Sequence, residues 1–139
     1  MNNEVVILVV EDDEGHAELI RRNLSRAGIV NKIINFRDGE EILNYLLMRG
    51  NGPHRTKCTP HVLLLDIRMP KIDGTEVLKI VKSDPDLQKM PVIMITTTDD
   101  PIEIDYCHKL GCNSYITKPV EYDAFVNAVR QLGLFLSIV

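Results

Sequence analysis

The sequence predicts an α/β fold in which a parallel sheet is covered by helices on both faces. Short apolar runs rich in branched side chains alternate with segments whose apolar residues recur at helical spacing. Runs of four to six apolar residues are too short for interior helices and suit strands that are buried on both faces. The strand–helix unit repeats five times, which predicts a doubly wound sheet joined by right-handed crossovers.

The first strand is expected over Val5–Val10, a continuous apolar run that ends in four acids. The amphipathic helix expected after it has the following apolar stripe: Ala17, Ile20, Leu24 and Ala27. Gly28 is the expected end of this helix. The polar interruptions in residues 32–36 predict a short edge strand, and helical spacing returns between Gly39 and Met48.

The segment Arg49–Pro60 contains Gly, Pro and basic residues and predicts a mobile, irregular loop. The run Val62–Leu65 follows and predicts a central strand that ends at Asp66. A turn at Asp73–Gly74 precedes the next helix, whose apolar positions are Val77, Leu78 and Val81. Asp84–Asp86, with Pro85 between the acids, should break that helix.

The fourth strand is expected over Val92–Ile95 and runs into three threonines. Pro101 is suited to a helix start, and that helix should reach Gly111. Tyr115–Thr117 is the expected fifth strand, and Lys118 closes it. The last helix is defined by four apolar positions: Phe125, Ala128, Val129 and Leu132.

Length and composition bound the function of the chain. Its 139 residues, 45% of them hydrophobic, suit one domain with a substantial core. The net charge of −4 and the lack of a basic run argue against direct nucleic-acid binding. No apolar run approaches the roughly 20 residues of a membrane helix. An odd number of cysteines (Cys58, Cys107 and Cys112) predicts reduced thiols and a cytoplasmic protein.

Polar residues with complementary chemistry follow the predicted strands. They are Glu11 and Asp12, then Asp66, then Thr96, then Lys118. In open parallel sheets, ligands bind just past the carboxyl ends of the strands, so these side chains should meet. Clustered carboxylates repel one another unless a cation joins them, and an all-oxygen set predicts Mg²⁺. A metal, an ammonium and a hydroxyl around one carboxylate can stabilise a phosphoryl group during its transfer.

Four segments carry a family resemblance when taken together and in order. They are Val9-Val10-Glu11-Asp12, then Leu65-Asp66-Ile67-Arg68-Met69-Pro70 with Asp73-Gly74, then Ile95-Thr96-Thr97, and finally Tyr115-Ile116-Thr117-Lys118-Pro119. They resemble the signature blocks of two-component response-regulator receiver domains, and the resemblance extends from about Val5 to about Leu132. It implies a flavodoxin-like (βα)5 fold with strand order 2-1-3-4-5.

The resemblance implies that Asp66 accepts a phosphoryl group from a phosphohistidine of a sensor histidine kinase. Asp12, Asp66 and the backbone carbonyl of Arg68 would then ligate Mg²⁺. Glu11 would act through a metal-bound water. A domain of this kind promotes its own phosphorylation and dephosphorylation but is not an enzyme that turns over a separate substrate.

The resemblance also implies a switch. Lys118 would pair with one phosphoryl oxygen, and Thr96 would move to hydrogen-bond another. Tyr115 would change rotamer in response and alter the surface formed by the fourth helix, fifth strand and fifth helix. Arg68 and Thr98, each two residues beyond a signature residue, occupy positions that tune phosphate lifetime in this family.

Other functions have specific counter-evidence. Aspartyl-phosphate phosphatases related to haloacid dehalogenases need a second Asp two residues after the nucleophile, where this chain has Arg68. A degenerate receiver that acts without phosphate would usually lack the acceptor, the lysine or an acid. His16 is expected to be a surface residue of the first helix, and His61 and His108 are expected to be structural.

The expected domain organisation is one receiver domain over residues 1–139, with an apolar extension at about 133–139 and no output domain. The apolar tail predicts a homodimer, with folding back onto its own sheet as the alternative. The tail and the basic loop together resemble single-domain regulators paired with bacterial phytochrome kinases; a chemotaxis-type or phosphorelay shuttle is the alternative. Lys118–Pro119 is the expected cis peptide bond.

Overall fold

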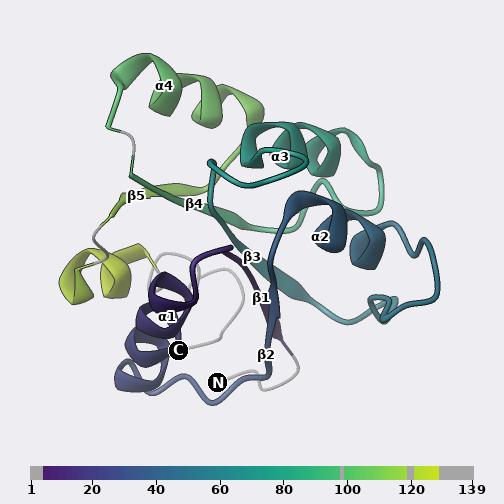
Figure 1. Ribbon diagram of the computed structural model, residues 1–139, viewed down its shortest axis with the longest axis horizontal. Helices are drawn as coiled ribbons and strands as arrows, with labels where there is room; N and C mark the ends of the chain where they lie inside the picture. The colour runs from purple at the N-terminus through teal and green to yellow at the C-terminus, as the bar shows by residue number, and fades with distance from the viewer. Residues whose placement is uncertain (1–4, 98, 119–120, 129–139) are drawn as a thin grey trace.

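The computed structural model describes residues 5–97, 99–118 and 121–128. Five strands form one parallel sheet in the order β2-β1-β3-β4-β5, as the sequence and its resemblance predict (Figure 1). The strands are β1 (Val6–Val10), β2 (Ile33–Phe36), β3 (His61–Leu65), β4 (Val92–Thr96) and β5 (Ser114–Thr117).

Helices connect consecutive strands. They are α1 (Glu14–Arg26), α2 (Gly39–Leu46), α3 (Gly74–Ser83) and α4 (Pro101–Leu110). Residues 122–128 are also helical, and the remainder of the expected last helix lies outside the described residues. The predicted helix ends are largely confirmed: Pro101 begins α4, and Gly111 ends it in a left-handed conformation with φ of 110°, which a residue without a Cβ adopts at little cost.

Alternating strand residues build two separate cores. One core packs the sheet against α2, α3 and α4, and the other packs it against α1 and the helical residues 122–128 (Figure 1). Leu8, Leu63 and Met94 point into the first core, whereas Ile7, Leu64 and Ile93 point into the second. β3 is buried at every position, as expected for the central strand of a doubly wound sheet.

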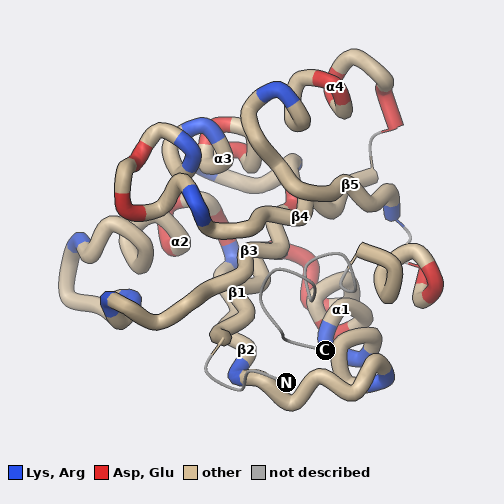
Figure 2. Tube along the Cα trace, turned by 180° about the vertical axis from the view of Figure 1, so that it is seen from behind, with Lys and Arg blue, Asp and Glu red and all other residues tan. Residues whose placement is uncertain are grey.

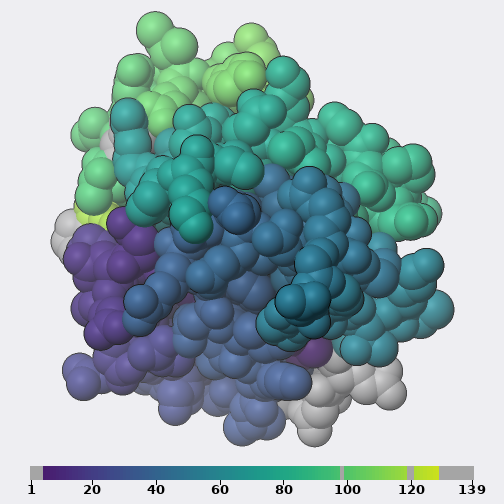
Figure 3. All heavy atoms as spheres, turned by 45° about the vertical axis from the view of Figure 1, so that its right-hand side comes forward, coloured from purple at the N-terminus to yellow at the C-terminus, as the bar shows by residue number. Residues whose placement is uncertain are grey.

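The segment between α2 and β3 is irregular, as predicted, but it is tied to the helix beside it. The guanidinium Nε of Arg55 donates to the carbonyl of Leu46 at 2.7 Å, and the backbone N–H of Arg55 donates to Tyr45 at 3.0 Å. The segment is therefore fastened to α2, and the blue and teal parts of the chain adjoin on the face shown in Figure 3. A cis peptide bond occurs here, at Gly52–Pro53.

Surface charge and helix length bear on possible partners. Lys and Arg residues are spread over several elements of the described chain (Figure 2). None of its helices combines the length and apolarity that a bilayer crossing requires.

Candidate functional site

The carboxyl ends of the parallel strands bring the predicted site residues to one edge of the sheet. β1 runs into Glu11 and β3 runs into Asp66, and the two strands pair in register at Val10 and Leu65. Thr96 is the last residue of β4 and pairs with Thr117 of β5. Lys118 follows directly, and its backbone N–H donates to the carbonyl of Thr96 at 2.7 Å.

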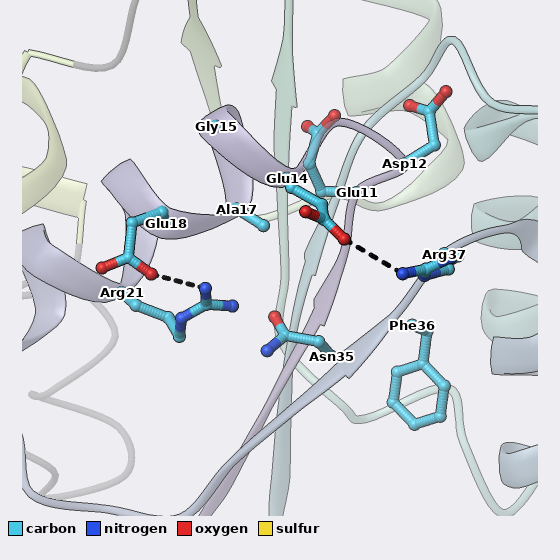
Figure 4. Close-up of a pocket in the computed structure, with 10 residues that line it drawn as sticks. All are labelled: Glu11, Asp12, Glu14, Gly15, Ala17, Glu18, Arg21, Asn35, Phe36 and Arg37. Carbon is cyan, nitrogen blue, oxygen red and sulfur yellow. Dashed lines mark hydrogen bonds and ion pairs between the residues drawn. The ribbon is translucent and has the colours of Figure 1, made fainter.

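The four acids after β1 divide into different roles. Asp13 is the N-cap of α1, and its Oδ1 accepts the backbone N–H of His16 at 2.9 Å. Glu14 lies in the first helical turn, where the helix dipole favours a negative charge. Glu11 and Asp12 are left to face the sheet edge, and their carboxylates point to the same side in Figure 4.

Glu11, Asp12 and Asp66 form an acidic cluster. Each offers a carboxylate oxygen, and these oxygens lie within 4.8 Å of one another. Glu11 and Asp66 are each 5% exposed, whereas Asp12 is exposed. Burial raises the pKa of Glu11, and the charge of Asp66 acts in the same direction, while the hydrogen bond from Lys118 opposes both. A set of oxygen ligands with this excess of negative charge suits a hard divalent cation.

The ammonium of Lys118 lies between the two buried carboxylates. Its Nζ is 2.5 Å from Oε2 of Glu11 and 3.1 Å from Oδ2 of Asp66. The side chain is only 6% exposed, so these ion pairs are screened less than surface pairs. Lys118 thus places a positive charge beside Asp66, where an oxygen of a phosphoryl group on that carboxylate would carry negative charge.

Thr96 and Tyr115 belong to neighbouring strands behind this cluster. Thr96 is fully buried. Tyr115 pairs with Met94 in register and packs against the core beneath α4. Burial is the main cause of a raised pKa at Tyr115, so its hydroxyl is neutral at physiological pH. The two side chains needed for the predicted switch therefore lie on adjacent strands.

Arg68 connects the site to α4. Its backbone N–H donates to Oδ1 of Asp66 at 3.3 Å, while its guanidinium Nη2 lies 3.3 Å from Oε2 of Glu103. Glu103 is in the first turn of α4. The Arg68 side chain thus spans from the loop after Asp66 to the helix that follows Thr96.

The turn after Asp66 brings the start of α3 against the end of β3. Asp73 caps α3 by accepting from the backbone of Glu76 at 3.1 Å, and Gly74 donates its N–H to the carbonyl of Ile67 at 2.7 Å. A Cβ on Gly74 would meet the Asp66 carbonyl oxygen at 2.1 Å. Only glycine permits this approach, which explains the Asp-Gly pair in the motif.

A cleft of about 530 Å³ opens beside the acidic cluster, between α1 and β2. Glu11 and Asp12 line one end of it (Figure 4). One ion pair, between Glu14 and Arg37 at 3.0 Å, joins the two sides of the cleft, and a second, between Glu18 and Arg21 at 2.5 Å, lies along α1. The cleft therefore gives a solvent-accessible approach to the acids from the α1 side.

Comparison with known proteins assigns the family. A sequence model described as the response regulator receiver domain matches residues 7–130. The chain belongs to the response regulator receiver domain family. A receiver domain structure from Rhodospirillum rubrum is 45% identical, with a TM-score of 0.76, and the match covers 96% of this chain and 94% of that one.

A bacteriophytochrome response regulator and a cyanobacterial response regulator are among the similar receiver domains. The bacteriophytochrome response regulator RtBRR is 40% identical, with a TM-score of 0.82 and coverage of 92% of this chain and 77% of that one. Response regulator Rcp1 of Synechocystis is 34% identical over 117 residues, which is 84% of this chain and 78% of Rcp1. A Mn²⁺-bound structure of Rcp1 matches with a TM-score of 0.77 at 32% identity over 96% of each chain.

One residue beside the cluster of this receiver domain was not expected there. His16 was predicted to be a surface residue, and its side chain is indeed 46% exposed, but its Nδ1 lies 3.0 Å from Nζ of Lys118. The sequence did offer one signal for this contact, since His16 lies in the first turn of a helix that begins at the carboxyl end of the sheet, next to the acidic cluster. Thr98 and the Lys118–Pro119 peptide bond lie outside the described residues.

The other histidines and the cysteines lie away from the cluster. His61 is buried and lies 3.2 Å from the hydroxyl of Tyr45, as a structural role predicts. Cys107 and Cys112 are free thiols in the core beneath α4. Burial raises the pKa of Cys112 to about 12, so this thiol stays protonated and unreactive.

Proposed function

We propose that Asp66 is the phosphoacceptor and receives its phosphoryl group from a phosphohistidine of a sensor histidine kinase. The observation that carries the proposal is the position of the buried Asp66 carboxylate, which lies in the acidic cluster and 3.1 Å from the Lys118 ammonium. In the transfer, a carboxylate oxygen of Asp66 attacks phosphorus, the P–N bond breaks, and the released imidazole nitrogen is protonated. The product is an acyl phosphate.

The acidic cluster is the proposed Mg²⁺ site. Asp12 and Asp66 would ligate the ion through their carboxylates and Arg68 through its backbone carbonyl, with Glu11 acting through a bound water. The all-oxygen donor set and its excess negative charge support this assignment. Mg²⁺ would supply charge stabilisation at the phosphoryl oxygens.

The remaining side chains are proposed to sense the phosphoryl group. Lys118 pairs with one of its oxygens, and Thr96 moves to donate a hydrogen bond to another. Tyr115 follows that movement and changes the surface around α4 and β5. Arg68, two positions beyond the acceptor, can influence α4 through its ion pair with Glu103. Arg68 and Thr98 together tune the phosphate lifetime.

The proposed output is a change of partner rather than turnover of a separate substrate. A surface that changes around α4 and β5 would carry the signal by binding or by assembly. The free thiols fit a cytoplasmic location, where a kinase domain would meet the receiver. Arg68, at the position where a phosphatase of the haloacid-dehalogenase type needs a second Asp, argues against that enzyme class.

A phytochrome-linked kinase is the proposed upstream partner. The similarity to the bacteriophytochrome response regulator RtBRR supports this assignment, and a chemotaxis-type or phosphorelay shuttle is the alternative. We also propose that residues 133–139, with the last helix, mediate a homodimer. Their apolar sequence supports this, and the segment itself lies outside the described residues.

The test of the phosphoacceptor is labelling by acetyl phosphate in the presence of Mg²⁺, read by intact-protein mass spectrometry. Wild type should gain one phosphoryl group, and Asp66→Asn should gain none because the amide cannot form the acyl phosphate. Chelation of Mg²⁺ should abolish labelling of wild type. Equal labelling of Asp66→Asn would place the acceptor elsewhere and refute the proposal.

A further inference from the structure

The ammonium of Lys118 has three hydrogen-bond partners in the described structure. They are Oε2 of Glu11, Oδ2 of Asp66 and Nδ1 of His16, at 2.5, 3.1 and 3.0 Å. An ammonium has three protons and no lone pair, so each proton has an acceptor. Because Lys118 can only donate, this contact is a hydrogen bond when Nδ1 of His16 is the unprotonated ring nitrogen and the ring proton is on Nε2. The same Nδ1 also lies 3.7 Å from Oε1 of Glu11 and 4.0 Å from Oδ1 of Asp13.

Two of these acceptors differ in kind from the third. Glu11 and Asp66 belong to the acidic cluster, so a bound cation draws on the same carboxylates that hold Lys118. His16 lies outside that cluster, and its neutral ring nitrogen does not add to the negative charge of the cluster. It is therefore the one partner of the three that is not itself a carboxylate of the cluster, and its shortest contact is the one with Lys118.

The backbone at His16 is fixed independently of its ring. Oδ1 of the N-cap residue Asp13 accepts the His16 backbone N–H at 2.9 Å, which anchors the first turn of α1. The ring is half exposed, whereas the Lys118 side chain is 6% exposed. A half-exposed imidazole thus contacts an ammonium that is itself almost completely shielded from solvent.

We propose that His16 is a positioning residue, which holds the Lys118 ammonium beside Asp66 and so promotes phosphoryl transfer. This inference rests on the proposed phosphoacceptor function. The competing interpretation is a solvated helix residue whose contact with Lys118 has no consequence. If His16 positions Lys118, a side chain that reproduces the acceptor at Nδ1 should preserve the labelling rate, and one that reproduces Nε2 should not. If the contact has no consequence, both side chains should give the same rate.

The chain can be tested with three substitutions at His16. In His16→Asn, the amide oxygen takes the place of Nδ1 and still accepts from Lys118. In His16→Gln, the amide oxygen takes the more distant place of Nε2. His16→Ala removes the acceptor altogether. Arg22→Ala, on the same helix but in a surface pair with Glu18, is the matched control for helix substitution.

Labelling rates with acetyl phosphate and Mg²⁺ should separate these variants. A misplaced catalytic group commonly slows a reaction by about tenfold or more, so His16→Ala and His16→Gln should be labelled roughly tenfold more slowly than wild type. His16→Asn and Arg22→Ala should stay within about twofold of wild type. A wild-type rate in His16→Ala, or equal rates in His16→Asn and His16→Gln, would overturn the inference.

Two further measurements identify the cause of any slowing. The ¹⁵N chemical shifts of the His16 ring, recorded without metal, should show the proton on Nε2 in wild type and a mixture of tautomers in Lys118→Ala. Mg²⁺ affinity should be unchanged in His16→Ala, since all three carboxylates remain. A proton on Nδ1, or a large loss of Mg²⁺ affinity, would contradict a role through Lys118. Failure of wild type itself to be labelled would instead refute the phosphoacceptor function.

Discussion

Glu11 and Asp12 are adjacent in the chain, but the fold gives them different environments. Glu11 is buried against Lys118, and Asp12 remains exposed. Burial raises the pKa of Glu11, because desolvation disfavours the charged carboxylate. The ion pair with Lys118 offsets part of this cost. The same pair of acids thus supplies one carboxylate held in place by the protein and one that is accessible to solvent and ions.

His61 provides a test of burial at a single residue outside the site. Desolvation lowers the pKa of its imidazole below the ordinary value of 6.5. Below about pH 6.5 the unfolded chain therefore binds a proton that the folded chain does not bind until lower pH. The free energy of unfolding should consequently be fully retained above that pH and fall as the pH drops, by at most about 1.4 kcal/mol per pH unit for this proton.

Urea unfolding between pH 7.5 and pH 5 would measure this effect. The slope of unfolding free energy against pH should be smaller in His61→Gln than in wild type, whatever the absolute stability of the variant. An unchanged slope in His61→Gln would show that this imidazole does not carry the acid sensitivity.

At the scale of elements, the start of α3 controls where Asp66 is presented. Gly74 lies against the backbone of Asp66 and Ile67, and a Cβ there would approach to 2.1 Å and 2.8 Å. Since backbone atoms cannot move aside as a flexible side chain can, Gly74→Ala must displace α3 from the end of β3. We expect a loss of about 1–3 kcal/mol in unfolding free energy and slower labelling of Asp66, measured by urea unfolding and acetyl phosphate.

Gly15→Ala is the matched control for that experiment. Its Cβ would meet only a side-chain oxygen of Asp13, at 3.2 Å, and alanine is the better helix former by up to about 1 kcal/mol. Stability should therefore be unchanged or slightly higher. Equal stability of the two alanine variants would contradict the close-approach explanation for Gly74.

The elements themselves were largely predictable because their signals are local. Apolar runs marked the central strands, and Pro101, Gly28 and Gly111 marked helix ends. Contacts between distant segments carried no such signal: Arg55 bonds the carbonyl of Leu46, and Arg68 pairs with Glu103 across 35 positions. The periodicity of an element cannot report which side chain of another element will lie beside it.

At the scale of the whole molecule, the site follows from sheet topology. The runs of apolar residues predicted parallel strands whose carboxyl ends share an edge, so the meeting of Glu11, Asp66 and Lys118 could be anticipated. The strand order came from the family resemblance, because alternation alone does not determine which strands are neighbours. His16 was missed since its contact with Lys118 joins α1 to the end of β5, and that pairing depends on the complete fold.

Assembly is the remaining property of the whole molecule that can be tested. Residues 133–139 contain five large apolar side chains, namely Leu134, Phe135, Leu136, Ile138 and Val139. Burying such a side chain contributes about 1.5–3 kcal/mol, so pairing of two tails is a substantial driving force. We expect full-length protein to sediment as a dimer and a version ending at Leu132 as a monomer.

A second apolar surface offers the control for that experiment. Ile102 and Tyr106, one turn apart on α4, are 80% and 47% exposed. Ile102→Ser should leave the dimer intact if the tail and last helix form the interface. A dimer that survives truncation but dissociates in Ile102→Ser would assign the interface to α4. Monomers in both the full-length and truncated proteins would instead favour a tail that folds back on its own sheet.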